Sequence, residues 1–193
     1  MSDSPVALSP WAYDPVQRGF HWVMAAIILV ALGLGVWARM LPPGEGIRPA
    51  LLDIHKSLGL TALILVGFRL AYRLLRGEPP FREPPGALAH GAAQSTHWAL
   101  YALMIFMPVT GYVYSAAGKH SLAWFGLFSF PNLAPHDDAL AHAGQRFHYF
   151  GAWAIGLLLC AHLAAVVWHF LVRRDDVLAR MVPYLARWRW GGA

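Results

Sequence analysis

Four histidines, His21, His55, His148 and His162, lie at helical spacings within apolar stretches of the chain. Fourteen residues separate His148 from His162, which corresponds to about 21 Å along a helix that rises about 1.5 Å per residue. Fourteen steps of about 100° return to within roughly 40° of the starting direction, so both imidazoles point the same way. One helix can therefore offer a ligand to each of two cofactors at two different depths.

The composition is typical of a membrane protein. Hydrophobic residues make up 58% of the chain and charged residues 13%, about half the charged share of an average soluble domain. A length of 193 residues fits one compact bundle rather than two domains. The formal net charge of +5 comes from basic residues that flank the apolar stretches, which argues against nucleic acid as a partner.

The hydropathy pattern predicts an all-α fold, a membrane-embedded bundle of four helices that forms a single domain over residues 1–193. Each apolar stretch is long enough to cross a bilayer whose hydrocarbon core is about 30 Å thick. Proline and glycine clusters such as Pro42–Gly44 separate the stretches. The predicted spans are approximately 20–38, 52–75, 95–115 and 146–172.

Three smaller features need an interpretation. The apolar piece LAWFGLFSFPNL, residues 122–133, is too short to span, and we expect it at headgroup level. The first span could be a cleaved signal peptide, but no strongly basic stretch precedes it and a histidine opens it, so we interpret it as retained. Cys160 is the only cysteine, and we expect it to be a small buried hydrophobe.

The positive charges predict an orientation. The positive-inside rule places the more basic side of a membrane protein in the cytoplasm, and the side with both termini and the second connection is the more basic one. Both termini are therefore expected in the cytoplasm, with His21 and His162 at an inner level and His55 and His148 at an outer level. The inner side holds Arg18, Arg69, Arg73, Arg76, Arg82, Arg173, Arg174, Arg180, Arg187 and Arg189, and the outer side Arg39, Arg48, Lys56, Lys119 and Arg146.

The two histidine levels suggest haem. An imidazole inside the hydrocarbon region needs a polar partner, and one imidazole on each face of a haem gives a six-coordinate iron suited to electron transfer. For any single histidine an interhelical hydrogen bond explains the residue at least as well as ligation does, but four histidines that match in depth favour two haems. Zinc fits less well, because the levels are too far apart to share one ion and neither shows cysteine or clustered carboxylates.

Further residues fit around such cofactors. Arg69 follows His55 by fourteen residues, so its guanidinium should reach the inner level and either neutralise a haem propionate or snorkel to the surface. His97 and His169 are expected closer to the cytoplasm than the inner iron, as quinone-binding or proton-relaying groups, or as plain interfacial histidines. Small residues that let helices or a flat macrocycle approach are Gly33, Gly35, Gly59, Gly67, Gly111, Gly151 and Gly156. The remaining histidines, expected in solvated connections, are His90, His120, His136 and His142.

Several strings along the chain together resemble the bacterial cytochrome b561 family, the di-haem inner-membrane proteins that include superoxide oxidase. The strings are RGFHW, DIHKSLGL, HWALYALMIFMPVTGY, WFGLFSFPNL, FHYFG, AHLAAVVWHF and RDDVLARMVP, and the resemblance covers residues 18–183. It implies that His21 and His162 bind the iron of an inner haem b, and that His55 and His148 bind that of an outer haem b.

The resemblance also implies an activity: oxidation of superoxide at the outer face of the bacterial inner membrane and reduction of ubiquinone within it. Lys56, Lys119 and Arg146 would attract the anion to the outer face, and His169 matches a position implicated in quinone binding in the family. Two positions depart from some relatives: Gly19 stands where they carry a small hydroxyl residue, and Gln94 where they have a histidine.

Two alternatives to this activity remain open. The chain could be a cytochrome b subunit that anchors a dehydrogenase or hydrogenase and passes its electrons to quinone. In a different class, it could be a non-redox membrane scaffold or a haem carrier. Co-purification of an iron–sulfur partner would favour the first, and a redox-inactive purified protein the second.

Overall fold

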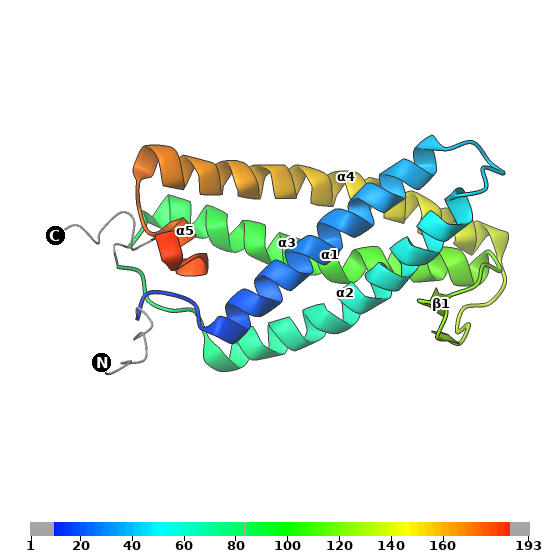
Figure 1. Cartoon of the computed structure of the whole chain (residues 1–193), viewed down its shortest axis with the longest axis horizontal. Coiled ribbons are helices and arrows are strands. Elements are labelled where there is room, and N and C mark those ends of the chain that lie inside the picture. Colours follow the sequence, from blue (N-terminus) through cyan, green and yellow to red (C-terminus); the bar gives the residue numbers. More distant parts are fainter. Residues whose placement is uncertain (1–9, 83, 186–193) are drawn as a thin grey trace, which may run out of the picture.

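Four long helices form the body of the molecule in this computed structural model, which describes residues 10–82 and 84–185. Figure 1 shows them running side by side along the long axis. The elements are α1 (Pro15–Met40), α2 (Arg48–Arg76), α3 (Ala87–Ala117), β1 (Ala123–Trp124), β2 (Phe128–Ser129), α4 (Asp138–Trp168), the π-helical turn η1 (His169–Arg173) and α5 (Val177–Met181).

Local signals in the sequence set several helix ends. The Asp14 carboxylate caps α1 by accepting from the backbone N–H groups of Val16 and Gln17 at 2.9 and 3.0 Å. Gly77 ends α2 with a φ of 71° and a ψ of −169°, a conformation that is essentially confined to glycine. Asp137 caps α4 by accepting from the N–H of Leu140 at 2.7 Å.

The prediction of an all-α membrane bundle is confirmed. Each of the four helices is long and apolar enough to cross a membrane. The first three extend at both ends beyond the span expected from hydropathy, and α4 begins before its expected span. Large apolar side chains such as Phe68, Phe150 and Leu157 are exposed on the outside of the bundle, as befits a surface that faces lipid. The expectation that Cys160 is buried was wrong, because its side chain is exposed on α4.

Two ends of the bundle must be distinguished. The terminal end holds the start of α1, the α2–α3 link and α5, and the hairpin end holds the α1–α2 link and the α3–α4 connection with β1 and β2 (Figure 1). Arg187 and Arg189, which contributed to the predicted orientation, lie outside the described residues.

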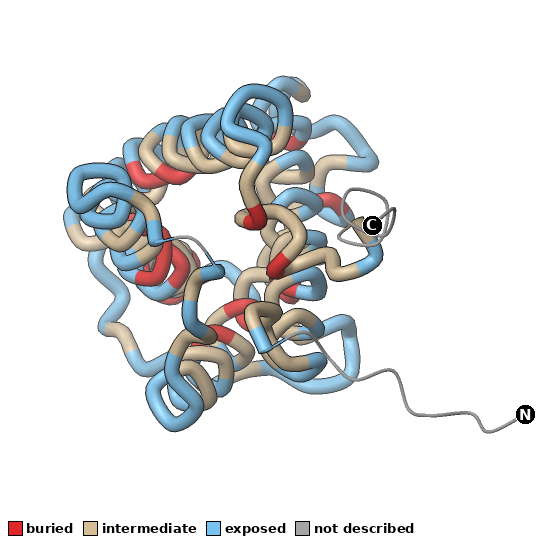
Figure 2. The backbone as a smooth tube through the Cα atoms, turned by 90° about the vertical axis from the view of Figure 1, so that its left-hand side faces the viewer, coloured by how far each residue is buried: buried red, intermediate tan, exposed pale blue. Residues whose placement is uncertain are grey.

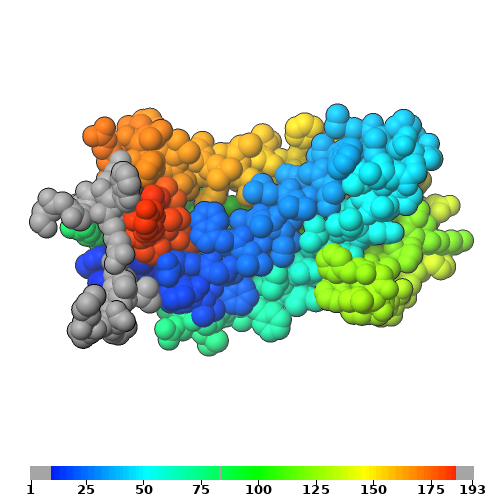
Figure 3. All heavy atoms as spheres, viewed as in Figure 1, coloured from blue at the N-terminus to red at the C-terminus, as the bar shows by residue number. Residues whose placement is uncertain are grey.

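The four helices form a ring in the view along the bundle (Figure 2). The closest packing joins α1 to α2, α2 to α3 and α3 to α4, whereas α1 and α4 are not among the closely packed pairs of the described chain. Figure 3 shows the surface hollowed between α1 and α4. The ring is therefore loosest where the first and last long helices face each other.

A buried apolar cluster fills the middle of the bundle between the two ends. Met24, Val66, Tyr101 and Ile155 belong to it, one from each long helix. Ile155 lies seven residues from both His148 and His162 along α4. The cluster therefore separates the two histidine levels.

At the hairpin end, the α3–α4 connection folds back onto α2. Ser57 is 1% exposed. Its hydroxyl accepts from Phe125 N at 2.9 Å and shares its one proton between Asp53 O at 2.8 Å and Ala123 O at 3.2 Å. Trp124 Nε1 donates to Thr61 Oγ1 at 3.0 Å. These bonds hold the short β1–β2 hairpin against the side of α2.

Candidate functional site

The structure brings His55 of α2 and His148 of α4 together at the hairpin end. Their ring centres are 5.8 Å apart and the ring planes differ by 86°. Each ring is held through Nδ1, which lies 2.7 Å from Ala31 O in His55 and 2.9 Å from Met107 O in His148. A carbonyl oxygen can only accept, so Nδ1 carries the proton and the Nε2 lone pair is left for a ligand.

Two glycines make room for these rings. A Cβ atom on Gly35 of α1 would lie 2.9 Å from His55 Cε1, and one on Gly111 of α3 would lie 3.0 Å from His148 Cε1. Both distances are shorter than ordinary van der Waals contacts. The absence of a side chain at these two positions therefore allows both imidazoles to lie directly against neighbouring helices.

His21 of α1 and His162 of α4 meet at the terminal end, across the loosely packed side of the ring. Their ring centres are 6.3 Å apart and the ring planes differ by 54°. Arg69 of α2 reaches the same level, with Nη2 3.0 Å from His21 Nδ1. The predicted depth match between Arg69 and this histidine level is thus a contact in the structure.

His97 also belongs to this level, unlike the prediction from sequence. Its ring centre lies 5.6 Å from that of His162. The difference arises because α3 begins at Ala87 rather than near residue 95, which places His97 ten residues, or about 15 Å, inside the helix.

Both pairs have the separation that two axial imidazoles on one iron require. With a metal–nitrogen bond of about 2 Å, two such rings have centres roughly 6 Å apart. The observed 5.8 and 6.3 Å agree with this value. In His55 and His148 the Nδ1–H donation to a carbonyl is also the usual support of a metal-ligating histidine.

A metal bound by protein side chains alone fits the structure less well. Within residues 10–82 and 84–185, no group of three or more His, Cys, Asp or Glu side chains is arranged to hold a metal ion. Each histidine pair supplies only two ligands. The donor set therefore suits an iron whose four remaining ligands come from a macrocycle.

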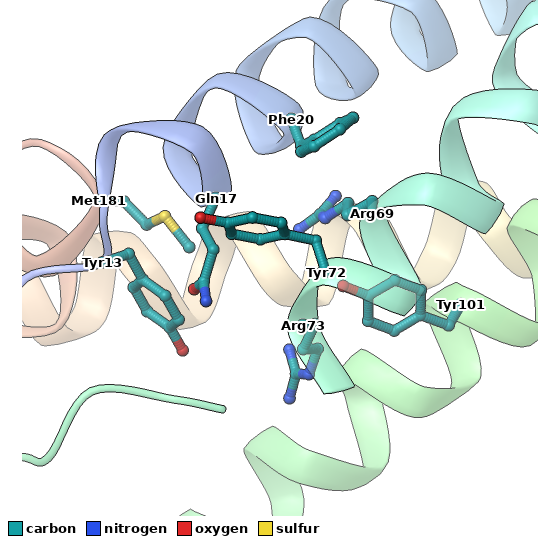
Figure 4. Close-up of a pocket in the computed structure, with 8 residues that line it drawn as sticks. All are labelled: Tyr13, Gln17, Phe20, Arg69, Tyr72, Arg73, Tyr101 and Met181. Atoms are coloured by element: carbon teal, nitrogen blue, oxygen red, sulfur yellow. The ribbon is translucent and has the colours of Figure 1, made fainter. Parts of the chain in front are cut away.

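A small pocket with both polar and apolar walls lies beside Arg69 at the terminal end (Figure 4). It has a volume of about 300 Å³, including the part open to solvent. Burial raises the pKa of the Tyr13 phenol, so this side chain stays a hydrogen-bond donor. The pocket combines guanidinium, phenol and amide groups and is lined by Tyr13, Gln17, Phe20, Arg69, Tyr72, Arg73, Tyr101 and Met181.

The two arginines of this pocket differ in their partners. Arg73 pairs with Glu78, which also accepts from Gln94 Nε2 at 3.3 Å. Gln94, which stands where some relatives have a histidine, thus forms a hydrogen bond with Glu78. Arg69 is not among the residues that form the ion pairs of the described chain, and its guanidinium lies over the Tyr101 ring at 5.4 Å from the ring centre.

His169 lies beyond the inner pair, at the junction of α4 and η1. Its Nδ1 is 2.6 Å from Asp175 Oδ2, a contact that sequence reasoning missed because the turn between the two residues leaves no clear local signal. The predicted solvated histidines His90, His120, His136 and His142 are all exposed, although His90 and His142 lie within helices.

The three basic residues expected to attract an anion differ in exposure and in the partners that they already have. Lys119 and Arg146 are exposed at the hairpin end. Lys56 is held, since its ammonium lies 2.8 Å from Asp53 Oδ1 and donates to Ser121 O at 2.8 Å. Its charge is partly neutralised, and the residue helps to fix the α3–α4 connection.

Known proteins resemble this chain over nearly its whole length. A family described as prokaryotic cytochrome b561 matches residues 12–184. Cytochrome b561 homolog 2 of Escherichia coli K12 is 27% identical over 174 residues, which cover 90% of this chain and 93% of the relative. The probable superoxide oxidase CybB of Yersinia pestis is 28% identical over 171 residues, 89% of this chain and 96% of the relative. Cytochrome b562 of Cereibacter sphaeroides is 25% identical over 174 residues, 88% and 94% of the two chains.

Proposed function

Because this chain belongs to the prokaryotic cytochrome b561 family, we propose that it moves electrons across the membrane through two b-type haems, from superoxide to ubiquinone. Haem b binding and membrane electron transfer follow from the family. The number of haems, the donor and the acceptor are our proposal. The observation that carries it is the pair of histidine levels, with ring-centre separations of 5.8 and 6.3 Å.

His55 and His148 would hold one haem at the hairpin end, and His21 and His162 the other at the terminal end. When bound, such haems supply reversible one-electron chemistry. The chain's own contribution is to fix the ligands. The carbonyls of Ala31 and Met107 orient the hairpin-end imidazoles, and two imidazoles on each iron would leave no open position for oxygen.

Arg69 supports the terminal-end site. If His21 binds iron through Nε2, its Nδ1 carries a proton and can no longer accept from Arg69. The guanidinium then needs an anionic acceptor, because an unpaired charge at this depth is costly. A haem propionate in the adjoining pocket meets that need (Figure 4).

The hairpin end is the proposed site of superoxide oxidation. We place it outside, since the positive-inside rule assigns the more basic terminal end to the cytoplasm. Lys119 and Arg146 are exposed there and would raise the local concentration of an anion, while the paired Lys56 contributes less. The similarity to a protein named as a probable superoxide oxidase supports this donor.

The terminal end is the proposed site of quinone reduction. His169 lies seven residues beyond His162 on the same helix, roughly 10 Å closer to the cytoplasm. It is only partly buried, so a quinone ring that enters from the lipid can reach it. His97 lies at the level of His162 and is better placed to pack against the haem there than to meet a quinone at the surface.

Stopped-flow mixing of the purified oxidised protein with superoxide, followed by ubiquinone, tests the proposal. We expect rapid reduction of the haems and then reoxidation by the quinone. Haems that superoxide does not reduce, in a protein that co-purifies with an iron–sulfur subunit, would instead identify a cytochrome b subunit of a larger complex. A redox-inactive purified protein would indicate a scaffold or haem carrier.

A further inference from the structure

The chain turns sharply where α4 ends, and the turn brings a carboxylate to His169. After Trp168 the helix widens into η1, and Arg174 then takes a left-handed conformation with a φ of 57°. The Arg174 N–H donates to His169 O at 2.7 Å and closes the turn. Asp175 is thereby placed with Oδ2 2.6 Å from His169 Nδ1.

The carboxylate of Asp175 is itself held in place. Its other oxygen, Oδ1, accepts from the backbone N–H of Val177 at 3.2 Å, at the start of α5. The side chains of His169 and Asp175 are 22% and 20% exposed, so the pair lies at the edge of the bundle and not in its core. The backbone on both sides of the pair therefore fixes the orientation of the imidazole.

This geometry determines which nitrogen of His169 can act on a ligand. Nδ1 donates its proton to Asp175, and Nε2 points away from the carboxylate. The bond from Nδ1 to Asp175 Oδ2 fixes the plane of the ring, as in other histidine–carboxylate pairs that move protons. When the ring carries a second proton, Nε2–H is an oriented proton donor at the side of the membrane where a quinone would be reduced.

The elements next to the pair carry further charged residues. The elements packed against η1 are α4 and α5. Asp176 is 8% exposed, and its Oδ2 has no hydrogen-bond partner within the described chain. Arg180 is committed elsewhere, because it donates to Trp11 O and Pro79 O. The ionisable residues on the adjoining parts of these elements are His162 on α4, Arg180 on α5, and Arg173, Arg174, Asp175 and Asp176 in the turn.

We propose that Asp175 is a positioning residue that makes His169 the proton donor for quinone reduction. The proposal rests on the proposed function, which supplies the electrons. Two superoxide ions lose one electron each and leave as two molecules of oxygen. The quinone gains these two electrons and two protons and becomes a quinol. Each proton passes from His169 Nε2 to a quinone oxygen, and His169 is reprotonated from water at the terminal end.

Asp175→Asn separates this role from a structural one. The amide oxygen of asparagine can still accept from Val177 N, so the start of α5 keeps its support while the negative charge next to His169 is lost. Asp175→Glu restores the charge. Asp138→Asn, which removes an exposed carboxylate from the opposite end of α4, is the matched control.

The assay follows reoxidation of the superoxide-reduced haems by a soluble ubiquinone, between about pH 5.5 and about pH 8.5. In Asp175→Asn we expect the limiting rate to fall about tenfold and its dependence on pH to change, since a hydrogen bond to a charged group is lost. The half-saturating quinone concentration should stay within about twofold of the wild-type value, and the rate of haem reduction by superoxide should not change. Asp175→Glu should recover most of the rate.

The outcomes distinguish the two proposals. A wild-type protein whose haems ubiquinone does not reoxidise refutes the proposed function. A wild-type protein that works, together with an Asp175→Asn protein of the same rate and pH profile, refutes the role of Asp175. If Asp175→Asn loses its haems, the test is made on the wild-type protein. Haem reoxidation that is insensitive to both pH and D₂O would overturn the proposal. Haem reoxidation that slows in D₂O, while haem reduction by superoxide does not, would support it.

Discussion

Replacing Gly35 by alanine should disturb the hairpin-end site alone. The new Cβ would lie 2.9 Å from His55 Cε1, and the ring cannot move away without weakening its bond to Ala31 O at 2.7 Å. Overpacking of this kind costs about 1 to 3 kcal/mol. Because about 1.4 kcal/mol corresponds to a tenfold change in affinity, we expect haem at this level to be held between about 5-fold and roughly 140-fold more weakly.

Gly33→Ala is the matched control for this prediction. Nothing lies within 4 Å of a Cβ atom at Gly33, and both substitutions should favour the α1 helix by about 1 kcal/mol. Haem content and a redox titration of the two purified variants give the comparison. Gly35→Ala should lose haem from one site or shift one of two midpoint potentials, whereas Gly33→Ala should match the wild type. An unchanged Gly35→Ala protein would mean that the imidazole position does not depend on this contact.

Other variants test the separate parts of the site. His148→Ala should remove the hairpin-end haem and spare most of the terminal-end haem, and His162→Ala should remove the terminal-end haem and spare most of the other. Equal loss of both haems from either folded variant would count against two independent sites. Arg69→Gln should lower the midpoint potential of one haem by about 60 mV, because the reduced haem loses about 1.4 kcal/mol of stabilisation by the positive charge. Two unchanged potentials would show that Arg69 does not face a haem. Ser57→Ala should cost about 1 to 3 kcal/mol through lost hydrogen bonds and speed hydrogen exchange of residues 123–129, and unaltered exchange there would contradict the anchoring role of Ser57.

The helical fold and the histidine levels could be predicted because both depend on local periodicity. Consecutive helices of the bundle run antiparallel, so α2 and α4 run in the same direction. The fourteen-residue intervals on these two helices therefore put His55 and His148 at one depth, and Arg69 and His162 at the other. The structure places these side chains close together. Whether they bind haem stays a prediction.

Features that depend on chain reversal or on exact helix ends could not be predicted. His97 reaches the level of His162 because α3 starts at Ala87, inside a stretch whose mixed polarity hides the helix. The ion pair of Lys56 involves a neighbour one turn away, but its bond to Ser121 O requires the α3–α4 connection to fold back. The contact between His169 and Asp175 likewise depends on the left-handed Arg174, a non-glycine residue that gives no sign of that conformation.

The central claim is that each chain holds two bis-histidine haems. Quantifying haem b per polypeptide in the purified protein, together with the spin state of the iron, tests it most directly. We predict two haems b per chain, both low-spin, because each of the two histidine pairs can fill both axial positions of one iron. One haem per chain, or a high-spin spectrum, would contradict the account.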